Sequence, residues 1–128
     1  MNNTAYPLQY LQGIEYFNQG AYFEAHEIWE EIWMESSGIQ KIFYQALIQL
    51  SVALYHLEAQ NLKGALSLYP KTMEKLSQLP DLFTGLNIRE LEKTINNFFK
   101  SYITFKPCDT YQIPYDNIPK ITLITTLT

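Results

Sequence analysis

The chain has little of several features that would assign it to a particular protein class. Its 128 residues include one cysteine, Cys108, which excludes an intramolecular disulfide framework and fits a reducing compartment. The five glycines are scattered, and none belongs to a glycine-rich phosphate-binding loop. No apolar run approaches the ~18 residues of a membrane-spanning helix. The first ten residues have neither the basic nor the apolar character of a secretion signal. We therefore expect a cytoplasmic protein.

Basic residues are absent from the first part of the chain. The first of them is Lys41, and the six acidic residues before it give residues 1–40 a charge of −6, within a net charge of −4. A chain with this charge distribution has no positive field to neutralise phosphates, so neither nucleic acid nor an anionic membrane is an expected partner. The six residues are Glu15, Glu24, Glu27, Glu30, Glu31 and Glu35.

Apolar side chains are abundant, at 47% of the chain with 15% aromatic. This composition excludes an intrinsically disordered polar chain, and the length suits about one domain. The apolar residues recur with helical periodicity between proline and glycine punctuation. We predict five helices, at 7–18, 21–35, 39–59, 62–78 and 87–102. Pro70 removes a backbone hydrogen bond from the fourth helix and should kink or locally break it.

The C-terminal part of the chain has a different character. Pro107, Pro114 and Pro119 exclude a continuous helix there, and residues 121–126 are rich in β-branched side chains. We predict an all-α fold in which residues 1–102 form an antiparallel bundle of stacked helical hairpins, because the connections are short. Residues 103–128 should form an extended tail that lies across the bundle or pairs with a partner chain. The second arrangement would be a homodimer.

The predicted helix at 21–35 carries two polar residues inside its apolar arc. On a helical wheel the apolar arc extends as far as Phe23 and Met34, and both His26 and Glu30 fall within it. The other glutamates of this helix share the remaining side. We therefore expect His26 and Glu30 to be buried and Glu27 to be solvated.

The next predicted helix, at 39–59, is apolar on most sides but has a narrow polar stripe. Gln45, Gln49 and His56 lie within about 40° of one another on the wheel. Because the two helices are antiparallel, His26 should lie level with Gln49 and Glu30 level with Gln45. His56 lies about 10 Å further along its helix than Gln49. The pattern predicts a buried network of His26, Glu30, Gln45 and Gln49.

Three interpretations of this cluster remain open. It can be a hydrogen-bonded core network that fixes helix register behind Trp29 and Trp33, or a small-molecule or partner site with the same lining. It can also hold a divalent metal, because the run His26-Glu27-x-x-Glu30 resembles the zinc motif H-E-x-x-H. Our preferred hypothesis is a non-catalytic binding or interaction module without a cofactor. The alternative is a metal-dependent, hydrolase-like enzyme that uses His26 and Glu30 as ligands and Glu27 as base.

The same residues carry a resemblance to a known family. The run F-N-x-G-x-Y-F-x-A-H-E-x-W-E-x-x-W, from Phe17 to Trp33, resembles the hallmark of domain-of-unknown-function family 309, as does the run FYQALIQLxVA from Phe43 to Ala53. The resemblance covers about residues 8–100. It implies a small bacterial α-helical bundle with no established activity. It also implies the following hallmark residues: His26, Glu27, Trp29, Glu30, Gln45 and Gln49.

Overall fold

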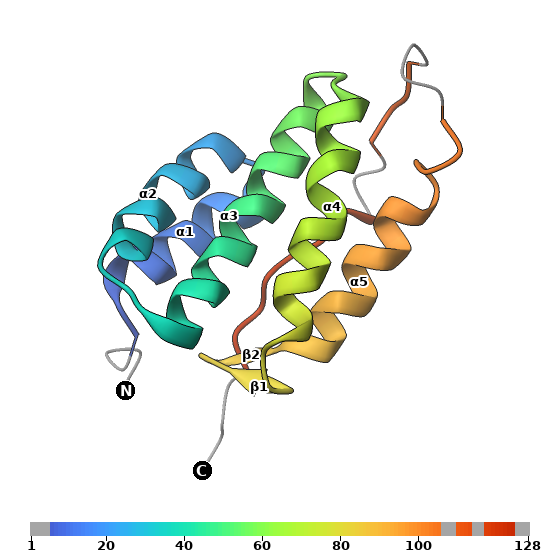
Figure 1. Cartoon of the computed structure of the whole chain (residues 1–128). Helices are drawn as coiled ribbons and strands as arrows, with labels where there is room; N and C mark the ends of the chain where they lie inside the picture. Colours follow the sequence, from blue (N-terminus) through green and yellow to red (C-terminus); the bar gives the residue numbers. More distant parts are fainter. Residues whose placement is uncertain (1–5, 106–109, 114–116, 125–128) are drawn as a thin grey trace.

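The computed structural model describes residues 6–105, 110–113 and 117–124. It contains five helices and one two-stranded hairpin, and the predicted all-α fold is confirmed (Figure 1). Each predicted helix is present, with its ends shifted by at most two residues. Cys108 lies outside the described residues. The elements are α1 (Leu8–Asn18), α2 (Tyr22–Met34), α3 (Gly38–Glu58), α4 (Leu62–Ser77), β1 (Leu82–Phe83), β2 (Leu86–Asn87) and α5 (Ile88–Lys100).

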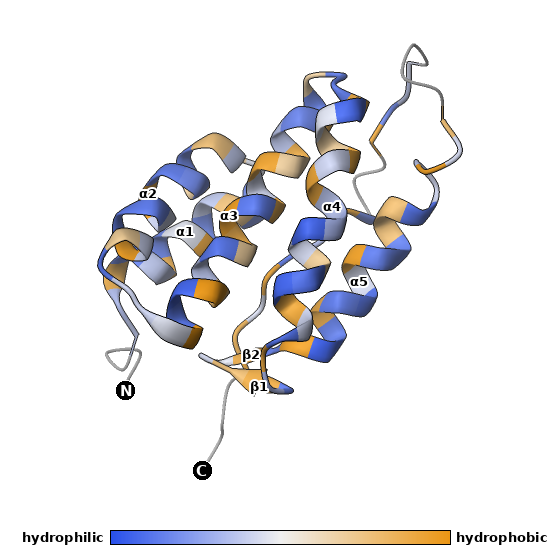
Figure 2. Cartoon of the chain, viewed as in Figure 1, coloured by the Kyte–Doolittle hydropathy of each residue, from blue (hydrophilic) through white to orange (hydrophobic). Residues whose placement is uncertain are grey.

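The first four helices pack in chain order, with α3 between α2 and α4 (Figure 1). Each helix carries both hydrophobic and hydrophilic residues, as expected of helices that bury one side and expose the other (Figure 2). The contact of α1 with α2 depends on Gly13, where a β-carbon would lie 1.9 Å from the indole nitrogen of Trp29. That indole donates a hydrogen bond to the Tyr10 carbonyl at 3.3 Å. Helix α3 joins α2 through the buried Ser51 hydroxyl, which donates to the Tyr22 carbonyl at 2.6 Å.

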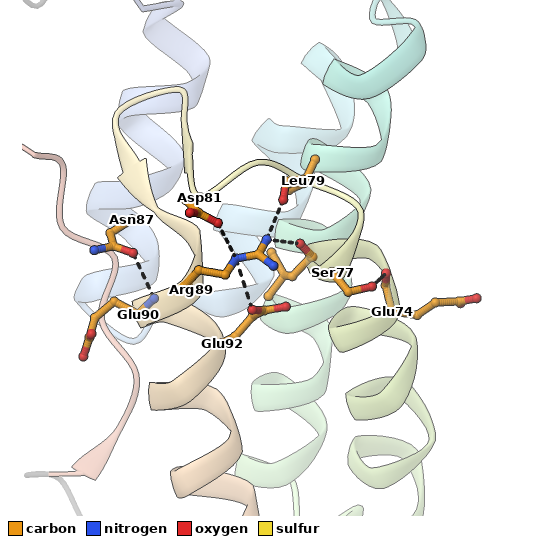
Figure 3. Close-up of polar contacts among 9 residues, drawn as sticks. Glu74, Ser77, Leu79, Asp81, Asn87, Arg89, Glu90 and Glu92 are labelled. Carbon is orange, nitrogen blue, oxygen red and sulfur yellow. Dashed lines mark hydrogen bonds and ion pairs between the residues drawn. The ribbon is translucent and has the colours of Figure 1, made fainter.

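Helix α4 is not broken at Pro70, because its residues remain helical from Leu62 to Ser77. It begins at Asn61, whose side chain accepts a hydrogen bond from the Gly64 amide. At its other end, Arg89 of α5 donates to the carbonyls of Leu76 and Leu79 (Figure 3). A guanidinium group at this position satisfies carbonyls that the last helical turn leaves free, and so ties α5 to α4.

No strand is predicted between residues 78 and 87, yet β1 and β2 pair there as an antiparallel hairpin. Thr84 and Gly85 connect the strands, and both have positive φ, at 47° and 79°. Two consecutive left-handed residues are characteristic of the type I′ turn, which forms the two-residue loop of many β-hairpins. The strands are two residues long, so they have no apolar alternation that could identify them in the sequence.

The described tail residues lie against the helices. Residues 117–124 run across the bundle as an extended segment, coloured red in Figure 1. Tyr111 and Ile121 are buried there. The Tyr111 hydroxyl donates a hydrogen bond to the Leu57 carbonyl at 2.8 Å, which fixes one part of the tail to the end of α3.

Candidate binding site

The two polar residues that the wheel placed together on α2 differ in how far they are exposed to solvent. The Glu30 side chain is 51% exposed, whereas that of His26 is 18% exposed, and the closest His26 Nε2 to Glu30 Oε2 distance is 3.9 Å. The expectation that Glu30 is buried is therefore wrong. The error arose because the apolar arc on the wheel was taken to be wider than the side of α2 that packs on the core. The core side of α2 is narrower, because Phe23 and Met34, which share the Glu30 side, are themselves exposed.

The predicted polar network does not form. His26 is held by its own helix, through a 2.7 Å hydrogen bond between its Nδ1 and the Phe23 carbonyl. Among the residues that the structure describes, Gln45 and Gln49 make no hydrogen bond to His26 or Glu30. The Oε1 atom of Gln49 is buried and has no partner within that same part of the chain.

The remaining predicted site residues occupy three different environments. Trp29 is fully buried in the core, while Trp33 is half-buried with the Lys41 ammonium 4.5 Å above its ring. Gln45 is half-buried on α3. His56 lies at the α3–α4 turn, where its Nδ1 is 3.3 Å from the Asn61 side-chain nitrogen. These residues therefore do not form one compact site with His26.

The donor set around His26 does not build a metal centre. One imidazole and one largely exposed carboxylate are fewer than the three protein ligands of a catalytic zinc site. No group of three or more His, Cys, Asp or Glu side chains suited to a metal ion occurs within residues 6–105, 110–113 and 117–124. Glu27, the base in the enzyme hypothesis, is exposed.

A cleft of about 380 Å³ opens beside His26, at the end of the bundle where α2 begins and α3 ends. Phe23 and Tyr55 form its aromatic part, with ring centroids 5.6 Å apart, and the Phe23 ring is 5.0 Å from that of His26. These two large side chains are 45% and 44% exposed. The cleft is lined by Gly20, Ala21, Tyr22, Phe23, Glu24, Tyr55 and Glu58.

The cleft is acidic as well as aromatic. Glu24 and Glu58 are its charged lining residues, and no Lys or Arg lines it. Partial burial raises the pKa of the Glu58 carboxyl, because desolvation disfavours its ionised form. Burial, together with the nearby Glu58 carboxylate, raises the pKa of Tyr22 to about 12, so its hydroxyl is neutral at physiological pH. The cleft therefore offers negative charge beside two exposed aromatic rings.

A larger cleft, of about 650 Å³, lies near the start of α1 and α3, with Tyr6, Ser37 and Tyr44 in its lining. Tyr44 is buried and Tyr6 half-buried, so this cleft presents no pair of exposed aromatic rings. The sequence signal for the smaller cleft was present but misassigned. Phe23 was placed in the apolar arc of its helix, and Tyr55 lies in a helix that was predicted to be apolar on most sides.

Comparison with known proteins relates this region to a family. Residues 10–68 match the model described as "Domain of unknown function (DUF309)". This part of the chain, a little under half of its length, is similar to the DUF309 family. The matched residues include most of α1 and the whole of α2 and α3. All residues that line the aromatic and acidic cleft therefore lie within the matched region.

Two curated proteins are similar to part of this chain. An uncharacterised protein of Aquifex aeolicus (strain VF5) is 30% identical over 77 residues, which are 59% of this chain and 23% of that protein. The uncharacterised protein YpuF of Bacillus subtilis (strain 168) is 44% identical over 62 residues, 47% of this chain and 36% of the relative. The chain thus spans only about a quarter to a third of the length of these relatives. Within its described residues, no helix has the length and apolar character needed to cross a bilayer.

Proposed function

We propose that this chain is a non-catalytic interaction module that binds a basic side chain of a partner protein in the cleft between Phe23 and Tyr55. One observation carries the proposal. Two half-exposed aromatic rings, those of Phe23 and Tyr55, line the same cleft as Glu24 and Glu58, and none of the lining residues is a cation. The lining has negative charge and no positive group, so a basic side chain of a partner would complement it.

Arginine is the side chain that matches this lining best. Its planar guanidinium can stack on an aromatic face while it donates hydrogen bonds to a carboxylate. Charge-assisted bonds of this kind are stronger than neutral ones, and more so where a carboxylate is partly desolvated, as Glu58 is. Aromatic residues paired with arginine also dominate the energetics of many protein interfaces.

The charge of the surrounding surface supports a basic partner. Most of α2 outside its core side consists of glutamates, and residues 1–40 carry six negative charges without a single Lys or Arg. A field of one sign raises the rate at which an oppositely charged partner associates. The cleft itself would fix the partner's position, while the α2 glutamates would steer its approach.

Gln45 and Gln49 lie further along α3 and do not line the cleft. The buried Oε1 of Gln49 is an acceptor without a partner in the described part of the chain, and Gln45 lies one helical turn away. His26, whose ring lies 5.0 Å from that of Phe23, adjoins the proposed surface, whereas Gln45 and Gln49 stay sequence predictions outside the lining of the cleft.

A direct test is an NMR titration with a blocked pentapeptide, Gly-Leu-Arg-Leu-Gly, against the same peptide with Glu in place of Arg. We expect the arginine peptide to shift the amide signals of Phe23, Glu24, Tyr55 and Glu58, and the glutamate peptide to leave them unchanged. Equal responses to the two peptides, or no response in the cleft, would contradict the proposal.

Matched variants distinguish binding in the cleft from nonspecific binding elsewhere on the surface. Phe23→Ala should weaken binding of the arginine peptide by about tenfold or more, because the stacking surface is lost. Leu82→Ala removes an exposed apolar side chain at the opposite end of the bundle, in β1, and should leave binding unchanged. Binding should also weaken as the pH falls and Glu58, whose pKa is raised, becomes neutral.

A further inference from the structure

A second cleft adjoins the aromatic one at Glu58. Its volume is about 570 Å³, and Glu58, the last residue of α3, belongs to the lining of both clefts, which therefore meet at this carboxylate. The second cleft takes the rest of its described lining from the turn after α3 and from the tail. Those residues are Gln60, Tyr111, Gln112, Ile113 and Ile118.

Hydrogen bonds hold the tail in place beside this turn. The Gln60 side chain binds the Tyr111 backbone in both directions: its amide nitrogen donates to the Tyr111 carbonyl at 3.1 Å, and its Oε1 accepts from the Tyr111 amide at 3.4 Å. The Tyr111 hydroxyl donates in turn to the Leu57 carbonyl. The polar groups of Gln60 and Tyr111 are therefore satisfied within the chain and need no partner.

The surface that the second cleft still offers to a partner is aliphatic. Ile113 and Ile118 pack against the core but are only partly buried. Covering the rest of their apolar surface is favourable. Glu58 supplies negative charge to this lining, and no Lys or Arg belongs to its described part. The first cleft thus presents aromatic rings and carboxylates, whereas the second presents aliphatic surface beside the carboxylate that both share.

We propose that the partner segment carries an aliphatic residue two positions from its arginine, and that this residue occupies the second cleft. The inference rests on the proposed function, because the arginine sets the position of the segment. In an extended segment, side chains two residues apart point to the same side and lie about 7 Å from each other. That spacing suits two clefts that meet at a single side chain. Adjacent side chains would point to opposite sides.

The two clefts differ in how they relate to the matched family. Every residue that lines the aromatic cleft lies within residues 10–68, the region similar to DUF309. The tail residues of the second cleft lie outside that region. In the proposed complex, the matched region therefore recognises the basic residue, and the tail selects among segments by the residue two positions away.

Two blocked peptides test the second cleft. Gly-Leu-Gly-Arg-Gly-Leu-Gly places leucine two positions from the arginine whichever way the peptide runs, and Gly-Gly-Gly-Arg-Gly-Gly-Gly lacks leucine. In NMR titrations of the full chain, both peptides should shift the Phe23 and Glu24 signals, and only the leucine peptide should shift those of Ile113 and Ile118. The leucine peptide should bind about tenfold more tightly, which is the effect of partly burying one aliphatic side chain.

A matched pair of variants assigns the gain to the tail. Ile113→Ser should remove the tenfold advantage of the leucine peptide and leave the affinity of the peptide without leucine unchanged. Ile103→Ser makes the same change at an isoleucine that is 56% exposed and lines neither cleft, so it should alter neither affinity.

The outcomes distinguish this inference from the proposed function. Equal affinities for the two peptides, with shifts confined to the aromatic cleft, would overturn the second contact and leave the proposed function standing. A leucine advantage that survives Ile113→Ser would also overturn it, because leucine would then bind elsewhere. No response to either peptide would contradict the proposed function, and the inference with it.

Discussion

The two sides of α2 both carry apolar side chains but pack differently. On one side Trp29 is fully buried and approaches α1 so closely that position 13 has no room for a β-carbon. On the other side Phe23 and Met34 are exposed, and so is Glu30, which lies between them in the sequence. The difference shows that an apolar arc on a wheel marks surface that a helix can bury. It does not show whether this chain or a partner buries it.

The largest expected effect is on the core side. Phe17 of α1 is fully buried, with its ring 5.2 Å from that of Tyr22. Phe17→Ala should lower the free energy of unfolding by about 3–5 kcal/mol, the usual cost of removing a buried phenylalanine. Urea denaturation followed by circular dichroism measures this loss. A change below about 1 kcal/mol would show that the α1–α2 seam is not the core.

Gly13→Ala should have the next largest effect. The added methyl group would overlap the Trp29 indole, so α1 and α2 would have to separate. Overpacking of this kind costs about 1–3 kcal/mol, which a thermal melt would record as a lower Tm. The neighbouring exposed Gln12, changed to Ala, is the matched control and should leave stability within about 0.5 kcal/mol. Equal melts for the two variants would argue against the close helix contact.

High pH should destabilise the core side through its buried tyrosines. Burial, with a further contribution from Glu58 in the case of Tyr22, raises the pKa values of Tyr22 and Tyr44 to about 12. The folded chain therefore keeps these protons at pH values where the unfolded chain, with tyrosine pKa values near ~10, loses them. Stability should be at its full value below about pH 10 and fall toward pH 12, by about 1 kcal/mol per tyrosine at pH 11. Urea unfolding across this range, with phenolate absorbance, tests the direction, and a rise in stability would contradict it.

The smallest expected effect is at Glu30. Its side chain is exposed and its 3.9 Å contact with His26 is a surface pair, so Glu30→Ala should change stability by no more than about 0.5 kcal/mol. A buried Glu30 would instead cost about 1–3 kcal/mol, because its partners would be left unpaired. Thermal melts of the variant distinguish the two.

The helices could be predicted because their signals are local. Apolar periodicity, Pro7, Gly20 and the Asn87 cap together define elements whose ends need no knowledge of the rest of the fold. The β1–β2 hairpin could not be predicted, because its strands are two residues long and Thr84 occupies a left-handed turn position usually held by Asn, Asp or Gly.

The candidate site was predicted only in part, because its geometry depends on which neighbours α2 has. His26 was predicted as part of a buried network, and the structure places its ring 5.0 Å from that of Phe23. The burial of Glu30 was inferred from the wheel alone, without the positions of α1 and α3. The attachment of Ile121 by Asn18 joins residues 103 positions apart. No periodicity or motif connects such a pair, so contacts of this kind follow only from the folded structure.

The most direct test of the account is the free energy of unfolding of Phe23→Ala, measured by urea denaturation beside that of Phe17→Ala. Both variants remove a phenylalanine ring, one from the exposed side of α2 and one from the core. The account predicts that Phe23→Ala stays within about 1 kcal/mol of the unmodified chain, because that ring is half exposed and is not part of the core. A loss of about 3 kcal/mol or more, comparable to that of Phe17→Ala, would show that Phe23 belongs to the core and that the proposed cleft is not a binding surface.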